Sequence, residues 1–191
     1  MKKVHVFVDN SNLFIEGKRV AKIDYVYDVD QLHCFRIEYG RLLDLIKSER
    51  EMGTAVLVGS RPPKQDTLWN KLKSLGLQPR IFDRSQFTGR EKGVDAELIN
   101  AIRDVMEDSP EKGVIALVAG DLDYLSTMER CVQKGWDVEI YFWSNAASKL
   151  KNLSGAKFID LDQSFPRITF QDKRDDIGDD KVSEGTVIYI A

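Results

Sequence analysis

The chain has 191 residues, of which 42% are hydrophobic and 31% charged, and this is the composition of a soluble globular protein. The length suits one domain with a substantial core. No apolar run approaches the roughly 20 residues that a transmembrane helix needs, so we expect no membrane partner, and the short apolar start predicts no signal peptide. Cys34 and Cys131 lack metal-ligand spacing, which favours free thiols in a reducing cytoplasm.

The net charge of −3 is unevenly distributed along the chain. Residues 171–191 carry six acidic and three basic side chains, so this tail accounts for the whole net charge and the remainder is neutral. The chain as a whole therefore has no net positive charge with which to attract nucleic acid. A local basic groove is not excluded.

The first half of the chain alternates apolar runs with amphipathic stretches. Val4, Val6, Phe7 and Val8 form a short buried strand that ends at Asp9. We expect the next elements to be a helix at 13–22, an irregular segment at 24–30, a helix at 37–50, a strand at 54–58, a loop at 59–63, a helix at 66–75 and a strand at 78–82. Gly76 is a plausible cap for the third helix.

The second half continues the same pattern after a polar segment at 83–93. We expect a helix at 94–108, a strand at 114–119, a helix at 122–134, a strand at 137–142, a helix near 146–153 and a strand at 157–161. The regular alternation predicts an α/β fold in which helices cover both faces of a mainly parallel sheet.

The alternation stops near residue 165, so we assign residues 1–165 to the domain and residues 166–191 to a C-terminal extension. Two strand-like pieces, 168–170 and 186–190, flank an acidic loop in this extension. They are expected to pair as a β-hairpin or to pack on a sheet edge, and a mobile acidic loop is an equal alternative.

Four carboxylates stand just beyond a predicted strand or at a predicted helix start. They are Asp9, Asp95, Asp121 and Asp123. If the strands before Asp9 and Asp121 are neighbours where the strand order reverses, these side chains face each other across the crevice in which open α/β sheets bind ligands. Such oxygen ligands suit Mg²⁺ or Mn²⁺, which activate water for attack on phosphorus. Taken singly, each acid is also explained as a helix cap or turn residue.

Polar and basic residues near the same edge are candidates for substrate binding. They are Asn10, Asn12, Ser60, Arg61 and Lys92. Turn chemistry explains the two asparagines equally well, and isolated loop bases are usually only solvated. No phosphate-binding glycine loop or dinucleotide fingerprint is present.

Three segments resemble the signatures of the NYN domain family, which belongs to the PIN-like superfamily of metal-dependent nucleases. They are Phe7-Val8-Asp9-Asn10-Ser11-Asn12-Leu13, Glu91-Lys92-Gly93-Val94-Asp95 and Ala119-Gly120-Asp121-Leu122-Asp123-Tyr124. The resemblance spans about residues 3–162. It implies a three-layer α/β/α, PIN-like and Rossmann-like domain whose acidic pocket binds Mg²⁺ or Mn²⁺ and cleaves RNA.

Carried over to this chain, the resemblance makes Asp9, Asp95, Asp121 and Asp123 the catalytic acids and metal ligands, with Asn10 and Asn12 lining the pocket. The family often has Ser between the two late acids and Phe after them, where this chain has Leu122 and Tyr124. We expect both changes to leave the carboxylates intact.

Two functions follow from the sequence, with a third ranked last. The first is a ribonuclease that hydrolyses RNA phosphodiester bonds with a divalent metal. The second is a catalytically weak or inactive NYN-type module that binds RNA or protein, with a second copy of the chain or another protein meeting the C-terminal extension. A phosphatase of the haloacid-dehalogenase type ranks last, because that chemistry needs a second Asp where this chain has Ser11.

Overall fold

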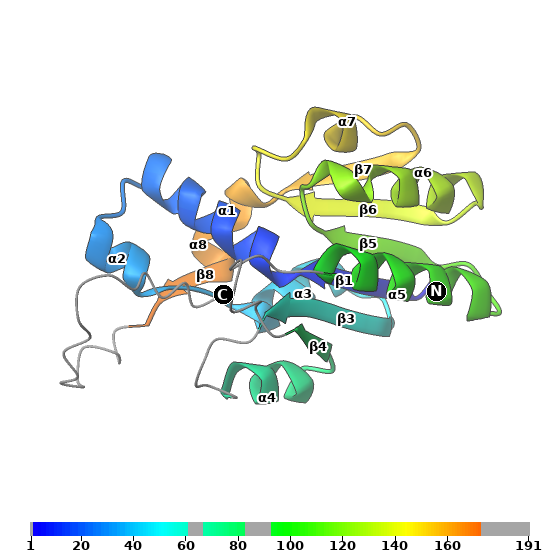
Figure 1. The fold of residues 1–191 in the computed structure, drawn as a ribbon, viewed down its shortest axis with the longest axis horizontal. Helices are drawn as coiled ribbons and strands as arrows, with labels where there is room; N and C mark the ends of the chain where they lie inside the picture. The colour runs from blue at the N-terminus through cyan, green and yellow to red at the C-terminus, as the bar shows by residue number, and fades with distance from the viewer. Residues whose placement is uncertain (1, 61–66, 83–92, 173–191) are drawn as a thin grey trace.

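The computed structural model describes residues 2–60, 67–82 and 93–172, which form a parallel six-stranded sheet between two layers of helices. The strands are β1 (Val4–Asp9), β3 (Met52–Ser60), β4 (Gln78–Phe82), β5 (Val114–Val118), β6 (Asp137–Phe142) and β7 (Ala156–Asp160). Their order is β4-β3-β1-β5-β6-β7, and every neighbouring pair is parallel. Figure 1 shows β1 running from the N-terminus toward α1 and α2 at the other end of the molecule.

The helices divide between the two faces of the sheet. They are α1 (Asn10–Ile23), α2 (Val29–His33), α3 (Tyr39–Lys47), α4 (Thr67–Ser74), α5 (Val94–Asp108), α6 (Leu125–Gln133), α7 (Ser148–Lys151) and α8 (Phe165–Ile168), with 3₁₀ turns η1 (Leu122–Tyr124) and η2 (Leu161–Ser164). Buried residues of α1, α3, α4 and α8 share one hydrophobic cluster, and those of α5, α6 and α7 share the other. The predicted three-layer α/β/α fold is therefore confirmed.

Strand β1 lies at the point where the strand order reverses. It pairs with β3 on one side, where Asp9 is opposite Val58, and with β5 on the other, where Val8 is opposite Val118. The chain builds outward from β1 to β4 in one direction and from β5 to β7 in the other. The predicted neighbourhood of the first strand and the strand before Asp121 is thus confirmed, and such a switch point is where ligands bind in this class of sheet.

The C-terminal part of the described chain packs onto the domain. β8 (Thr169–Gln171) pairs antiparallel with β2 (Phe35–Ile37) in a separate two-stranded sheet. In α8 the Phe165 ring is buried and stacks on Tyr25, with 4.0 Å between ring centroids. The expected partner of this strand in a hairpin, 186–190, lies outside the described residues, as does the acidic loop.

Several local expectations were wrong at their edges; for example, Gly59 and Ser60, expected in a loop, end β3. The first helix begins at Asn10 instead of residue 13, because the Asp9 side chain accepts a hydrogen bond from the backbone N–H of Asn12 and caps it. The segment expected to be irregular contains the start of α2, which a capping box of Asp28 and Gln31 stabilises. Ile37, expected in a helix, ends β2. None of the described helices has the length and apolar character to cross a membrane.

Candidate functional site

Asp9 is the last residue of β1 and lies at the carboxyl edge of the sheet. Its side chain is only 4% exposed. One carboxylate oxygen, Oδ1, accepts from the Asn12 N–H at 3.0 Å, and the other, Oδ2, accepts from the Tyr124 hydroxyl at 2.9 Å. A carboxylate is costly to bury without donors, and these two hydrogen bonds offset part of that cost.

Asp95 reaches the same place from the first turn of α5. Gly93 precedes this helix with φ of +93°, a conformation that favours glycine, and so sets the direction in which the helix starts. An ion pair of 2.6 Å between Arg80 on β4 and Glu97 fixes the first turns of α5 against the sheet. Negative side chains in this turn also interact favourably with the positive end of the helix dipole. Asp95 is therefore held on a stiff element.

Tyr124 joins the two carboxylates. Its hydroxyl lies 2.9 Å from Oδ2 of Asp9 and 3.1 Å from Oδ1 of Asp95, although these residues come from three separate segments. Burial and the charges of Asp9 and Asp95 raise the pKa of Tyr124 far above its ordinary value, so the phenol keeps its proton. The result is a compact Asp9–Tyr124–Asp95 cluster at the switch point of the sheet.

The loop after β5 is fixed by hydrogen bonds on both sides. The Gly120 N–H donates to the Asn12 side-chain oxygen at 2.8 Å, and the Gly120 carbonyl accepts from the Ala147 N–H at 2.9 Å. A side chain at position 120 would overlap the Phe142 ring, so glycine is required there. The next residues, Asp121 and Asp123, are both exposed. Asp121 caps η1 through a long contact of 3.5 Å with the Asp123 N–H.

Asn10 is fully buried behind Asp9. Its side-chain oxygen accepts a hydrogen bond from the Tyr39 hydroxyl, whose pKa is raised by burial. Its Nδ2 group has no hydrogen-bond partner among the residues that the structure describes. Asn12 thus contacts both Asp9 and the loop after β5, whereas the Asn10 side-chain oxygen is bound by Tyr39, and the role of both asparagines in lining a pocket stays a prediction.

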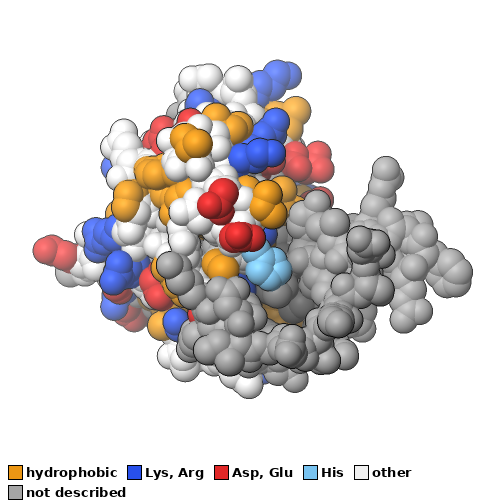
Figure 2. All heavy atoms as spheres, turned by 90° about the vertical axis from the view of Figure 1, so that its left-hand side faces the viewer, with side chains coloured by type: hydrophobic (Ala, Val, Ile, Leu, Met, Phe, Trp, Pro, Cys, Tyr) orange, Lys and Arg blue, Asp and Glu red, His pale blue; other side chains and the backbone are white. Residues whose placement is uncertain are grey.

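Of the other predicted substrate-binding residues, only the backbone of Ser60 is described, as the last residue of β3. Arg61 and Lys92 lie outside the described residues. Figure 2 shows the side of the molecule that carries α1 and α2, where acidic, basic and hydrophobic side chains are interspersed over the coloured part of the surface.

The cluster has the donor chemistry of a hard divalent cation. Asp9 and Asp95 offer oxygen ligands only, and Mg²⁺ is commonly held by one or two carboxylates together with waters and substrate phosphates. Across the described ranges, no three His, Cys, Asp or Glu side chains come close enough together to hold a metal ion. The two carboxylates therefore fit a cation whose remaining ligands are waters and substrate oxygens. A set of four carboxylates that includes Asp121 and Asp123 stays a prediction.

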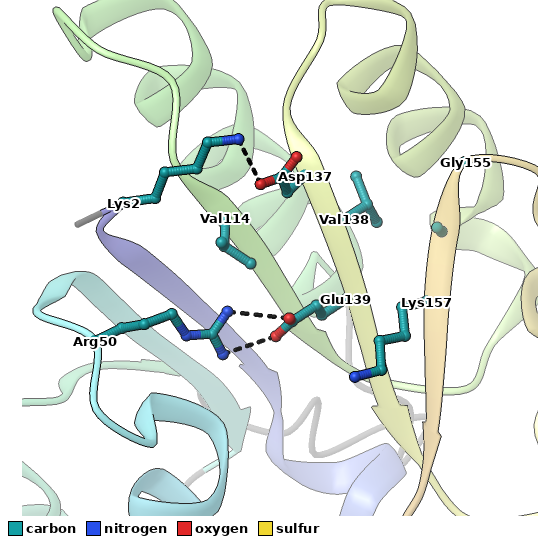
Figure 3. Close-up of a pocket in the computed structure, with 9 residues that line it drawn as sticks. Lys2, Arg50, Val114, Asp137, Val138, Glu139, Gly155 and Lys157 are labelled. Atoms are coloured by element: carbon teal, nitrogen blue, oxygen red, sulfur yellow. Dashed lines mark hydrogen bonds and ion pairs between the residues drawn. The ribbon is translucent and has the colours of Figure 1, made fainter.

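The opposite edge of the sheet has a different character. A pocket of about 490 Å³ opens there beside the amino ends of β5, β6 and β7 (Figure 3). Its acids are paired with bases: Arg50 binds Glu139 through two hydrogen bonds of 2.9 and 3.0 Å, and Lys2 lies 2.6 Å from Asp137. We therefore place the candidate site at the carboxyl edge.

Two tyrosines near the acids were not predicted from the sequence. The change to Tyr124 was expected only to leave the carboxylates intact, whereas its hydroxyl contacts two of the predicted ligands. The available signal was the departure itself, because a hydroxyl where the family often has Phe needs a polar partner once it is buried. Tyr39 offered no comparable signal within its own helix.

Comparison with known proteins gives the family and supports the fold. The sequence model of the NYN domain matches residues 3–162. A crystal structure of a protein of unknown function from Vibrio parahaemolyticus is similar to this chain, with a TM-score of 0.61 and 20% sequence identity, and the match covers 84% of this chain and 94% of the other. At that identity the likeness shows the fold alone. No curated protein matches this chain.

Proposed function

The chain belongs to the NYN domain family, a PIN-like family of proteins that are generally nucleases, and from this premise we propose that it is a metal-dependent ribonuclease. The observation that carries the proposal is the meeting of Asp9 and Asp95 at the Tyr124 hydroxyl, at the switch point of the sheet. Asp9 and Asp95 would hold Mg²⁺ or Mn²⁺ there, and the ion would supply an activated water and charge stabilisation at phosphorus.

The chain's own residues would bind and orient the reactants. Asp9 and Asp95 project from β1 and α5, two elements that pack on one another, so the direction of each carboxylate is fixed before any ligand binds. The Asn12–Gly120 bond holds the loop that presents Asp121 and Asp123 to solvent, where they can orient a water or an RNA phosphate-bound cation. This preorganisation is the main contribution that a protein makes to phosphoryl chemistry.

Two basic residues along α1 and β2 support an anionic substrate. Lys18 lies two turns along α1 from the site, and its pKa is lowered by burial and by the nearby charge of Arg36. Two positive charges held near one another are a feature that an RNA backbone would stabilise.

The alternative is an NYN-type module with weak or no catalytic activity that binds RNA or protein. One observation favours it: the described residues hold no group of three or more metal-ligating side chains. The coloured, described part of the face in Figure 2 also mixes acidic with basic side chains, whereas strong RNA binders cluster their basic ones. The two functions differ in whether cleavage of RNA depends on the carboxylates of the site.

The test is cleavage of end-labelled single-stranded and hairpin RNAs by the full chain with Mn²⁺ or Mg²⁺. We expect cleavage that excess EDTA abolishes and that Asp9→Asn lowers at least about a hundredfold. Asparagine keeps the side-chain oxygen that caps α1, so the variant should fold normally, which circular dichroism checks. Cleavage by Asp9→Asn at the wild-type rate would contradict the proposal, and no cleavage by the wild type on any RNA would favour the binding module.

A further inference from the structure

The Tyr124 hydroxyl occupies the space that a cation shared by Asp9 and Asp95 would need. The Tyr124 oxygen lies 2.9 Å from one carboxylate oxygen of Asp9 and 3.1 Å from one of Asp95. Both carboxylate oxygens are therefore held within hydrogen-bond distance of one atom. A phenylalanine at this position would fill the same apolar space and leave the gap between the carboxylates open. The hydroxyl is thus an addition to the site.

The ring that carries the hydroxyl has little freedom to move away. Tyr124 is 0% exposed and belongs to the hydrophobic cluster between the sheet and α5 and α6, which includes Phe7, Leu98 and Met128. Its backbone is part of η1, directly before α6. Side chains in such packed interiors keep their rotamers, so the position of the oxygen is fixed by the core.

The hydroxyl does for the carboxylates what a cation does, but more weakly. A phenol donates one proton, so it gives a charge-assisted hydrogen bond to one of the two acids at a time and keeps both within reach of one atom. A divalent cation that binds both acids must either displace the Tyr124 hydroxyl or use carboxylate oxygens that the hydroxyl does not contact. The energy of the hydrogen bond is then subtracted from the affinity of the site for the cation.

We propose that the Tyr124 hydroxyl is a built-in substitute for the cation, which holds Asp9 and Asp95 together in the metal-free protein and thereby weakens the binding of Mg²⁺ or Mn²⁺. This inference rests on the proposed function, since it assumes that these two carboxylates are metal ligands. It makes Tyr124 a positioning residue that sets how much free cation the site requires.

The first test is calorimetric titration of the full chain with MnCl₂. We expect Tyr124→Phe to bind Mn²⁺ about tenfold more tightly than the wild type, which corresponds to the loss of one hydrogen bond to a charged group. Tyr141→Phe is the matched control, because its buried hydroxyl donates to the Glu139 carboxylate at 2.7 Å on the other side of the molecule. This control should bind Mn²⁺ with wild-type affinity.

The outcomes separate the inference from the function on which it rests. Equal or weaker Mn²⁺ binding by Tyr124→Phe overturns the role of the hydroxyl and leaves the metal site standing. If neither the wild type nor Tyr124→Phe binds Mn²⁺, the metal dependence of the proposed function fails, and the inference fails with it.

Thermal unfolding gives a second readout that does not depend on activity. In EDTA, Tyr124→Phe should melt at a lower temperature than the wild type, because two adjacent carboxylates lose their shared donor. Saturating Mn²⁺ should then stabilise this variant by more than it stabilises the wild type. An unchanged melting temperature in EDTA would show that the hydroxyl does not hold the two acids.

Discussion

The two edges of the sheet hold their carboxylates in different ways. At the amino edge, Glu139 is bound by the Arg50 guanidinium through two hydrogen bonds and Asp137 is paired with Lys2 (Figure 3). At the carboxyl edge, Asp9 and Asp95 meet at a neutral phenol. The first arrangement pairs each carboxylate with a cationic side chain, whereas the second gives two carboxylates a shared neutral hydroxyl.

This difference separates structural carboxylates from functional ones. A guanidinium that is bound on both nitrogens ties an acid into the fold, and breaking such a pair costs stability because it leaves one charge unpaired. A hydroxyl donates to an acid without adding a positive charge, so this contact by itself does not neutralise the carboxylate. Substitutions at the two edges should therefore affect different properties of the protein.

The largest expected effect is on catalysis at the carboxyl edge. Asp95→Asn should lower RNA cleavage at least about a hundredfold, since outer partners of a metal ligand alone are worth about 10–100-fold. Asp95 is not needed to cap α5, whose N-cap is Gly93, so the melting temperature should change little. Single-turnover cleavage and thermal unfolding, measured on one preparation, check both statements. Wild-type cleavage by this variant would remove Asp95 from the site.

The next effect is on stability at the amino edge. Glu139→Gln should lower the free energy of unfolding by about 1.5–3 kcal/mol, the value of a hydrogen bond to a charged group in a partly buried site. RNA cleavage by the remaining folded protein should equal that of the wild type. Urea unfolding measures the first quantity, and a large loss of cleavage without loss of stability would break the distinction between the two edges.

A smaller effect is expected in the pH dependence of stability. Burial raises the pKa of Glu139, but hydrogen bonds from Arg50 and Tyr141 outweigh it and bring the pKa below its ordinary value of 4.5. A pKa that is lower in the folded state adds stability above the unfolded value and loses it as the pH falls through the folded value. The wild type should lose this stability below about pH 4.5, and Glu139→Gln should not, as urea unfolding between pH 3 and 6 would show.

The sheet was predictable because its strands are short apolar runs with sharp ends. The bounds of β4, α5 and β6 agree with the expected ones, since each stretch has a single consistent period and ends at a turn signal. The segment around α2 and β2 was not predictable. Its regular structure depends on pairing between Phe35 and Gln171 and on contacts with Phe165, and local propensity carries no information about partners so distant in the chain.

Of the predicted acids, the described contacts bring together Asp9 and Asp95, while the place of Asp121 and Asp123 in the site stays a prediction. Asp9 and the loop with Asp121 were assigned to one edge of the sheet because parallel strands end together there. The bond between Tyr124 and Asp9 joins residues 115 positions apart, and whether a hydroxyl reaches a carboxylate depends on ring orientation in the core. A pattern of residue types therefore identifies the edge, and the structure identifies the contact.

The central claim is that the carboxyl edge, and not the amino edge, binds a divalent cation. The most direct measurement is the anomalous scattering of a crystal of the full chain grown with Mn²⁺. We expect an anomalous peak beside the carboxylates of Asp9 and Asp95, next to the Tyr124 hydroxyl, and none in the pocket beside Arg50 and Glu139. A well-occupied peak elsewhere, with none beside Asp9 and Asp95, would overturn this assignment.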